Sequence, residues 1–449
     1  MRRVWGVLLL LGLITVPGSA FAVDVKVSGE FYAAGMYLDK TTFLKNSDAD
    51  GPSTAFYFQR LRVRTDFIIS PGLTLVTRFD AMERVWGGPR SAPGTVLDSL
   101  SQGTRAENEN IAFDFSYVRY ESPIGVLSVG YQPESNWGTV FGNSSTSVGK
   151  IRADSKVGPV WFSGYIAKPS EKSLTAINPT TASDRDRTTY MLSGTYAWKD
   201  GRAGLLYQYV DDRTTRSDLP TSYKAATHAF IPYAIAKIGP VALQAELTYV
   251  FGKATFDDLA GQDVDLSSID AWLDATADFG MFYVGATFAY VAGDDPATAN
   301  KMEGNLTAGG GADWNPCLIM WNYDRTYWAG ALNGYGYGAT SKTTFNGPMT
   351  NAWFYQVRGG VRPIAVLDIG LSVSHAYADK LPGANALTAV QKRTYGTEID
   401  LTATYKITNN LSYMLGAGYF FTGDYFKGKF DNVEVNNDYL VMNKLTLIF

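Results

Sequence analysis

Hydrophobic and polar residues alternate one by one along much of this chain. In the segment 60–69, arginine occupies positions 60, 62 and 64, while leucine, valine and phenylalanine occupy positions 61, 63 and 67. The same alternation runs through 269–278, 398–406 and 411–421. A period of two places apolar side chains on one face of an extended segment and polar side chains on the other. These segments are therefore predicted to be β-strands with one apolar face.

Short turn motifs alternate with long polar segments between the predicted strands. The turn motifs are rich in glycine, proline, asparagine and aspartate, which favour tight hairpins. They are Pro71-Gly72, Pro123-Ile124-Gly125, Gly158-Pro159, Lys199-Asp200-Gly201, Gly239-Pro240, Phe279-Gly280, Pro363-Ile364 and Asn409-Asn410. The long segments lie near 39–54, 87–110, 138–148, 170–186, 212–224, 254–268, 294–350, 380–393 and 424–437. All short turns are therefore expected at one end of the sheet and all long loops at the other.

The fold predicted from this pattern is all-β: a transmembrane, antiparallel, up-and-down β-barrel. Eight turns and nine loops join eighteen strands, and sixteen is the alternative count. Short periplasmic turns and long outer loops are typical of outer-membrane barrels. A soluble sandwich would have to bury all the apolar strand faces in one core. A membrane barrel instead turns those faces to lipid and its charges to a watery lumen.

The first residues have the layout of a secretory signal peptide. Arg2 and Arg3 precede the apolar stretch Val7–Val16, and Ala20-Phe21-Ala22 forms a small-residue cleavage site. The apolar stretch is shorter than the roughly 20 residues of a spanning helix. We expect residues 1–22 to be removed and residues 23–449 to form a single barrel domain, because no linker-like change of composition interrupts them.

Composition supports a barrel and argues against several other classes. Aromatic residues make up 14% of the chain and glycine is abundant, as in barrels with aromatic girdles. Without Arg2 and Arg3, 37 of the 39 basic residues remain against 43 acidic ones, a net charge of −6. No polybasic block is present, so nucleic acid is not an expected partner. The single cysteine, Cys317, can form no disulfide within the chain.

The C-terminal segment carries a family resemblance. Residues Tyr439, Val441, Leu445, Leu447 and Phe449 share one face of the last predicted strand. A final strand of this kind, ending in phenylalanine, resembles the assembly signal of bacterial outer-membrane proteins. In that class the last strand pairs with an edge of the outer-membrane assembly machinery. The chain therefore looks like a Gram-negative outer-membrane porin and, more narrowly, like the abundant porins of metal-respiring bacteria. The resemblance implies a place in the outer membrane of a Gram-negative bacterium, among its lipid and lipopolysaccharide.

Residues that face the predicted lumen are the candidates for function, because eighteen strands enclose a water-filled channel. The basic candidates are Arg60, Arg62, Arg64, Arg78, Arg119, Lys150, Arg152 and Lys156. The acidic candidates are Glu246, Asp270, Asp274, Asp278, Asp368, Glu398 and Asp400. The two sets lie on opposite sides of the ring, which predicts a basic wall, an acidic wall and a transverse field. Asp66, Asp80, Asp154, Arg358 and Arg362 break this separation, and the alternation slips between Phe115 and Val118.

The longest loop, 294–350, has an unusual apolar content. It contains the octet at 314–321 and further aromatic residues, with Trp314, Cys317, Trp321 and Trp328 as candidate constriction residues. An exposed apolar octet would be adhesive, so the segment needs a burial site. Two alternatives stay open: the loop folds into the lumen and constricts it, or it packs on itself as a surface cap.

Catalytic, metal and cofactor sites find little support in the sequence. Only His228 and His375 are present, and His375 falls on the predicted lipid face beside two serines. The segment 46–51 mimics the start of a calcium loop, but Tyr57 stands where the bidentate glutamate should be. The chain has no Cys-x-x-Cys-His motif for haem attachment. We expect no enzyme activity, no cofactor and no resident metal.

The expected function is passive diffusion of ions and small hydrophilic solutes through a charged, water-filled pore. The first alternative is a substrate-specific channel whose arginines at 60, 62 and 64 bind anions or acidic sugars. The second is a structural barrel that sheathes an electron-transfer partner. Homotrimers are common among porins, but nothing in the sequence marks an interface, so the oligomeric state is left open.

Overall fold

The structure is a computed structural model of the whole chain. It describes residues 23–45, 52–88, 111–171, 185–216, 223–256, 262–304, 306, 311–336, 344–383 and 389–449. The predicted signal peptide, 1–22, and the calcium-like segment, 46–51, lie outside the described residues. Within the described part the dominant structure is one closed sheet.

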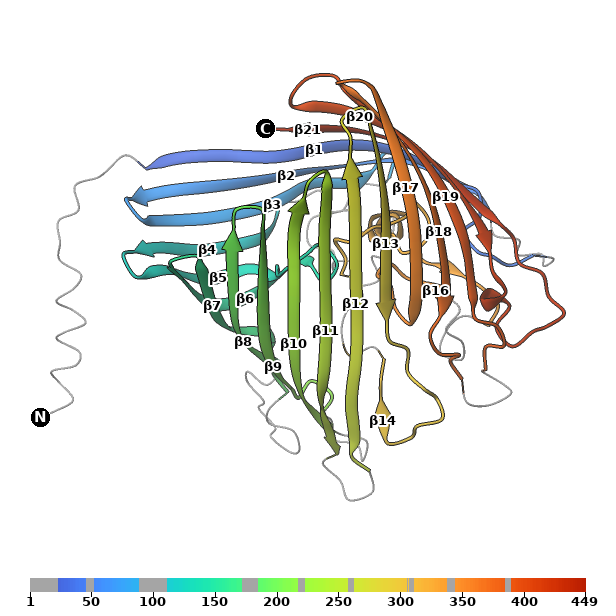
Figure 1. Cartoon of the computed structure of the whole chain (residues 1–449), viewed down its shortest axis with the longest axis horizontal. Coiled ribbons are helices and arrows are strands. Elements are labelled where there is room, and N and C mark those ends of the chain that lie inside the picture. Colours follow the sequence, from blue (N-terminus) through green and yellow to red (C-terminus); the bar gives the residue numbers. More distant parts are fainter. Residues whose placement is uncertain are drawn as a thin grey trace, which may run out of the picture.

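Eighteen antiparallel strands form the barrel, as predicted. They are β1 (Asp24–Leu38), β2 (Thr54–Ser70), β3 (Leu73–Val85), β4 (Ala112–Ser122), β5 (Gly125–Ser135), β6 (Ser144–Val157), β7 (Val160–Ser170), β8 (Arg187–Trp198), β9 (Gly201–Asp212), β10 (Tyr223–Ile238), β11 (Val241–Phe256), β12 (Val264–Asp278), β13 (Phe282–Val291), β17 (Ala352–Ile364), β18 (Leu367–Ala378), β19 (Thr394–Lys406), β20 (Leu411–Thr422) and β21 (Asp438–Ile448). Each strand pairs with the next in this order, and β21 closes the ring by pairing with β1. Figure 1 shows the blue β1 beside the red β21 at this seam.

The connections follow the predicted alternation of short turns and long loops. Two-residue turns join β6 to β7 and β10 to β11, at the end of the barrel that also holds the N-terminal end of β1. Gly158 and Gly239 in these turns have φ of +60° and +58°, a left-handed conformation that glycine adopts without a steric penalty. The long loops gather at the opposite end.

Short elements occur only within loops of the described chain. Between β13 and β17 lie β14 (Lys301–Met302), the helix α2 (Tyr323–Ala329), β15 (Leu332–Asn333) and β16 (Thr344–Phe345), while the 3-10 turn η1 (Asp424–Lys427) follows β20. β14 extends the sheet by pairing with β12, and β15 pairs with β16. Among the described residues, no helix has the length and apolar character needed to cross a membrane.

The outer surface of the barrel is apolar and carries aromatic residues near both ends. Outward side chains such as Leu192 remain exposed along the strand centres. Trp198 stacks on Tyr196 near the turns, and Trp353 stacks on Tyr377 near the loops. An apolar band between aromatic girdles matches the lipid-facing surface of a transmembrane barrel. The fold therefore turns the apolar strand faces outward and the polar faces inward, as the membrane-barrel interpretation predicts.

The largest cluster of buried apolar side chains lies inside the barrel. It joins inward residues of the wall, such as Phe354, Phe420 and Leu440, to Ile319 and Met320 of the loop that follows β13. A watery lumen would hold polar side chains at these wall positions. The candidate functional site is therefore a lumen that is partly filled by the chain's own loop.

Candidate functional site

The long loop between β13 and β17 enters the lumen at the loop end of the barrel. The backbone N–H groups of Ile319 and Met320 donate to the two carboxylate oxygens of Glu398 on β19, at 2.6 and 2.7 Å. Gln356 on β17 donates through Nε2 to the carbonyl oxygen of Pro316, at 2.8 Å. Glu398 is completely buried by this contact. The octet at 314–321 therefore lies against the inner wall and does not form a separate cap outside the barrel.

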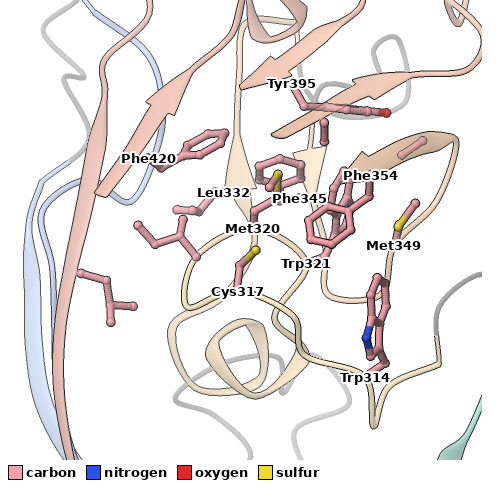
Figure 2. Packing of buried hydrophobic residues seen from close by; sticks show 14 of the residues in the cluster. Trp314, Cys317, Met320, Trp321, Leu332, Phe345, Met349, Phe354, Tyr395 and Phe420 are labelled. Carbon is pink, nitrogen blue, oxygen red and sulfur yellow. The ribbon is translucent and has the colours of Figure 1, made fainter. Parts of the chain in front are cut away.

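Three of the candidate constriction residues pack on inward aromatic side chains. Trp328 stacks on Phe58 of β2, with 4.5 Å between ring centroids. Trp314 and Trp321 approach Phe354 of β17 edge-on, at 5.6 and 5.8 Å. Figure 2 shows Trp321 and Phe354 side by side, with Trp314, which comes earlier in the loop, lower in the view. Burying a large apolar side chain is worth roughly 1.5–3 kcal/mol, so these contacts hold the loop firmly.

The helix α2 is stabilised within the lumen by its own capping groups. Asn322 Oδ1 accepts the backbone N–H of Arg325 at 2.8 Å, and Gly330, with φ of +85°, ends the helix. The buried Arg325 guanidinium donates to the carbonyl oxygens of Ile319 at 3.1 Å and Gly330 at 2.9 Å. Burial lowers the pKa of Arg325 to about 10, so it stays charged at neutral pH. These bonds join the apolar octet to the helix.

The fourth candidate, Cys317, is buried where the loop meets β19. Burial, with the nearby Glu398 and Asp400 carboxylates, raises the pKa of the Cys317 thiol well above its ordinary value. Without a bound cation the thiol is therefore neutral at physiological pH. It is a free cysteine in this structure.

A second, shorter loop also turns inward, between β5 and β6. Thr139 donates to a Glu246 oxygen on β11 through its backbone N–H, at 2.7 Å, and its hydroxyl, at 2.8 Å. Phe141 of this loop stacks on Trp272 of β12. The backbone N–H of Gly311 in the long loop donates to the carbonyl oxygen of Phe141. The two loops therefore meet inside the lumen. The sequence pattern suggests an inward position only for the longer one.

The arginine ladder on β2 lies on the lumen face. Its strand-mates of the same parity include Phe58, which contacts the internal Trp328, while Tyr57 of the other parity faces outward. Arg60, Arg62 and Arg64 pair with carboxylates, and so does Arg78 on β3. The pairs are Arg60–Glu83 (3.8 Å), Arg62–Asp80 (2.6 Å), Arg64–Asp66 (2.9 Å) and Arg78–Asp114. The ladder is therefore a row of ion pairs.

The other basic candidates also have partners on the inner face of β4 to β7. Arg119 pairs with Glu121, and Arg152 pairs with Asp154 at 2.8 Å. The Nζ atoms of Lys150 and Lys156 lie 4.7 and 4.8 Å from the ring centroids of Tyr165 and Trp161. Cation–π contacts of this length are attractive. These residues share one wall, but its arginines are balanced by acids.

The acidic candidates have equally specific partners. Two of them pair with Arg362 at the turn end, one pairs with Arg358, and one accepts a loop N–H. These contacts are Asp278–Arg362 (3.0 Å), Asp368–Arg362 (3.0 Å), Asp274–Arg358 (2.8 Å) and Ala292 N to Asp270 (3.2 Å). Glu246, Glu398 and Asp400 lie beneath the two internal loops. The predicted separation into a basic and an acidic wall is therefore replaced by mixed ion pairs, because an unpaired charge on a partly covered wall is costly.

Space remains on the side of the lumen that the long loop leaves uncovered. A cavity of about 470 Å³ opens toward the loop end, lined by polar groups that include Glu134, Arg187 and Gln208. A second cavity of about 350 Å³ lies toward the turn end and is lined by Arg64 and Arg119 among others. The second cavity is lined mainly by inward residues of the barrel wall, and the first is lined by the wall together with Trp137 and Gly142 of the shorter loop and Leu306 of the long loop.

Comparisons with known proteins agree with this fold. No protein-family model matches the chain, and no curated protein matches it in sequence. Among solved structures, OccAB1 of Acinetobacter baumannii is 12% identical, with 96% of this chain and 99% of that chain covered and a TM-score of 0.54. OccK9 (OpdG) of Pseudomonas aeruginosa is also 12% identical, with 95% and 99% covered and a TM-score of 0.53.

A third neighbour, OccK2 (OpdF) of Pseudomonas aeruginosa, was solved in complex with glucuronate. It is 11% identical, with 95% of this chain and 97% of that chain covered and a TM-score of 0.52. At such identities these likenesses show the fold. The fold predicted from the sequence, a closed antiparallel up-and-down β-barrel of eighteen strands, is confirmed, and solved outer-membrane channels share it. The narrower resemblance to porins of metal-respiring bacteria stays a prediction.

Proposed function

We propose that this protein is a channel of the Gram-negative outer membrane through which ions and small hydrophilic solutes diffuse. The observation that carries the proposal is the charged wall that the internal loop leaves open. The Arg64 and Arg119 side chains keep 45% and 41% of their surface exposed inside the barrel. A lumen with such groups, inside an apolar outer surface, suits passage of polar solutes across lipid.

The internal loops would set the size limit of this channel. Tyr327 of α2 hydrogen-bonds to Glu83 on β3, and Glu83 also lies 3.8 Å from Arg60. The helix therefore reaches the arginine ladder from the opposite side of the lumen. We propose that Trp314, Cys317, Trp321 and Trp328 anchor this constriction and that solutes pass along the ion-paired wall. Pore width would then depend on how firmly the loop is docked.

A second candidate function is a substrate-specific channel for anions or acidic sugars. Its support is the recurrence of arginine on one wall, since guanidinium groups bind carboxylates with matching geometry. A structural neighbour was crystallised with the acidic sugar glucuronate. The ion pairs weigh against it, because each arginine would have to exchange an internal carboxylate for that of the solute.

The alternative of a sheath around an electron-transfer partner has less support. A partner inserted into the barrel would need the volume that α2 and the octet at 314–321 occupy. It would have to displace contacts that include three buried tryptophans. The interior contacts favour a channel that is narrowed by its own loop.

The test is single-channel recording of the purified, folded chain in planar bilayers. We expect discrete openings of small conductance that persist in simple salts. Absence of any conductance from folded protein would contradict the channel. Saturable block by glucuronate, without block by a neutral sugar of equal size, would favour the substrate-specific alternative.

The end of the chain supports the expected route into the membrane. Phe449 and Gly29 exchange two backbone hydrogen bonds of 2.8 and 3.0 Å at the seam between β21 and β1. Tyr439 and Phe449 both expose their rings on the outer face. We propose that this strand is the signal read by the outer-membrane assembly machinery and that lipid and lipopolysaccharide surround the finished barrel.

A further inference from the structure

The docking point of the long loop brings together three potential metal ligands. They are Cys317 of the loop and Glu398 and Asp400 of β19, and each can offer one ligand atom such that all three atoms lie within 4.8 Å of one another. All three residues are buried. Glu398 and Asp400 have the same parity on β19, so both carboxylates face the lumen. Three acidic groups are thus collected where water is largely excluded.

One carboxylate oxygen in this cluster has no hydrogen-bond donor when Glu398 and Asp400 are both ionised. Asp400 is only 5% exposed, and its Oδ1 has no hydrogen-bond partner within the described part of the chain. Its other oxygen accepts from Ser372 Oγ only at 3.4 Å. Buried polar atoms without partners are rare in native structures, because desolvation is then uncompensated. A proton shared with the adjacent Glu398 carboxyl would pair this oxygen, and so would a cation, which the thiol beside it would help to bind.

The neighbouring strand, β20, leaves room beside the carboxylates. A Cβ atom built on Gly418 of β20 would lie 2.6 Å from Asp400 Oδ1 and 3.4 Å from Glu398 Oε1. Glycine is therefore the residue that permits these two oxygens to share one pocket. A cavity of about 270 Å³, lined by Cys317, Asp400 and Ser372 among others, adjoins the cluster. It offers an ion a way in from the lumen and space for a water ligand.

We propose that Cys317, Glu398 and Asp400 bind one divalent transition-metal ion, with Zn²⁺ as the best chemical match. Zinc takes thiolate at about 2.3 Å and carboxylate oxygen at about 2.0–2.2 Å, which brings ligand atoms within about 4 Å of one another. The three residues already approach that spacing. Three ligands with an open fourth position form a site that is reachable from the lumen. Calcium and magnesium are poorer matches because both prefer oxygen ligands.

Glu398 can take part without releasing the loop. Each of its oxygens accepts one backbone N–H, from Ile319 or Met320, and each has a second lone pair. Binding displaces the thiol proton of Cys317 to solvent, and any proton shared by the two carboxylates follows it. The ion then replaces protons as the counter-charge of the cluster.

A metal ion bound at this site would link the loop to the barrel wall. Cys317 belongs to the loop, whereas Glu398 and Asp400 belong to β19. An ion held by both sides adds its binding energy to the docked state and none to an undocked one. Metal would therefore reduce the fraction of time that the loop spends away from the wall.

The test is metal binding by the full chain, folded in detergent, free of affinity tags and stripped with a chelator. Co²⁺ serves as the probe, because a thiolate ligand gives a charge-transfer band in the near ultraviolet. We expect one Co²⁺ per chain with this band, and Zn²⁺ should displace it. Absence of the band in folded wild-type protein would overturn the proposal and leave a proton-sharing carboxyl pair.

Two variants of the site and one control make the result specific. Cys317→Ser preserves size and should abolish the band, while Asp400→Asn should weaken Co²⁺ binding at least tenfold. The control is the double variant His228→Ala, His375→Ala, which removes the usual ligands of stray transition metals. Both histidines lie on the outer face, where His228 contacts Tyr207 and His375 contacts Thr397. Loss of binding in this control, with binding retained in Cys317→Ser, would identify an adventitious ion only. Heat-dependent gel migration verifies that each barrel is folded.

Discussion

The two sides of the lumen are built on opposite principles. From β17 round through β21 to β2, the wall near the loops presents apolar side chains such as Phe354, Phe420 and Leu440, all buried against the internal loop. From β3 to β11 the wall presents ion pairs and polar groups that line open cavities. The same eighteen strands thus provide a packed core on one side and a wet surface on the other.

This difference shows how a loop that folds into the lumen can be recognised from the sequence of the strands that it contacts. A strand that faces lipid on one side and water on the other must alternate. Where it faces lipid on one side and a docked loop on the other, both faces become apolar. The end of β17, with Trp353 outward and Phe354 inward, shows the double apolar pattern. The same holds for β21, where Val441 faces outward and Leu440 is completely buried.

The largest expected effect comes from removing the packed side. Replacing residues 300–345 by a short Gly-Ser linker removes α2 and the octet and should raise single-channel conductance severalfold. The barrel should still form, because its eighteen strands pair with one another and only the short pair between β14 and β12 is lost. Planar-bilayer recording, beside gel migration of the folded barrel, measures both. Unchanged conductance in a folded barrel would mean that solutes never pass beside the loop.

The next prediction sharpens the comparison by loosening one loop at a time. Glu398→Gln leaves a single acceptor oxygen for two backbone N–H groups of the long loop. Charge-assisted hydrogen bonds are worth about 1.5–3 kcal/mol, so the docked population should fall about tenfold or more relative to the undocked one. We expect frequent transitions to higher conductance.

Glu246→Gln is the matched variant on the shorter loop. It disturbs the hydrogen bonds that Glu246 accepts from Thr139 and leaves in place those that Glu398 accepts from Ile319 and Met320. Smaller and separate current fluctuations are expected. If both variants fluctuate identically, the two loops move as one body, and the distinction between a packed and an open side is lost.

Much of the barrel is encoded by local patterns, and less of the lumen is. Alternation and turn residues predict the strand count, because each strand is recognisable from the alternation within it. Each short hairpin is likewise recognisable from its own turn residues. Asp114 shows where this fails. A bulge pairs Phe79 with Phe113 and Arg78 with Phe115, so Asp114 turns inward to Arg78. Strict alternation would place that carboxylate in lipid.

The ion pairs and the loop contacts escaped prediction for a related reason. Which carboxylate meets which arginine depends on the register between strands, and a single chain gives no direct reading of register. The sequence identifies the octet at 314–321 as a segment that needs burial. It does not say that Glu398, some 80 residues later, would supply the acceptors. The sequence predicts which face of β19 carries Glu398, but it does not predict which N–H groups donate to its carboxylate.

A third prediction concerns the open side alone. Replacing Arg60, Arg62 and Arg64 together by glutamine leaves carboxylates such as Asp80 and Asp66 without their counter-ions. The three positions span about 14 Å along β2, and charges act over about 8 Å at physiological salt. The reversal potential in a salt gradient should therefore shift toward cation selectivity, more strongly at low salt.

The control for the ladder removes three ion-paired lysines from the outer rim. Lys168, Lys253 and Lys301 pair with Asp186, Asp263 and Glu303, and roughly half of each lysine side chain is exposed. Changing all three to glutamine removes the same charge far from the ladder and should alter selectivity much less. Equal shifts in the two triple variants would show that net charge, and not the lumen wall, controls selectivity.

The smallest effect is expected where the long loop leaves the barrel. Asp295 accepts from Lys380 Nζ at 2.9 Å and from the backbone N–H of Ala297 at 3.0 Å. These contacts lower the pKa of Asp295 below its ordinary value. Stability from the pair is therefore fully present above the ordinary aspartate pKa of about 3.9 and is lost as pH falls through the lowered one. The pair is solvent-exposed, so its contribution is small and screened by salt.

Lys380→Met tests this exposed pair against the buried contacts of the same loop. At neutral pH we expect open-channel noise within twofold of the wild type, far less than for Glu398→Gln. Between pH 7 and pH 5 the difference should not change, because Asp295 stays ionised. In strongly acidic buffer it should vanish, since protonation of Asp295 breaks the pair in the wild type as well. A Lys380→Met channel as noisy as Glu398→Gln would place control of the loop at its stem and not in the packed side of the lumen.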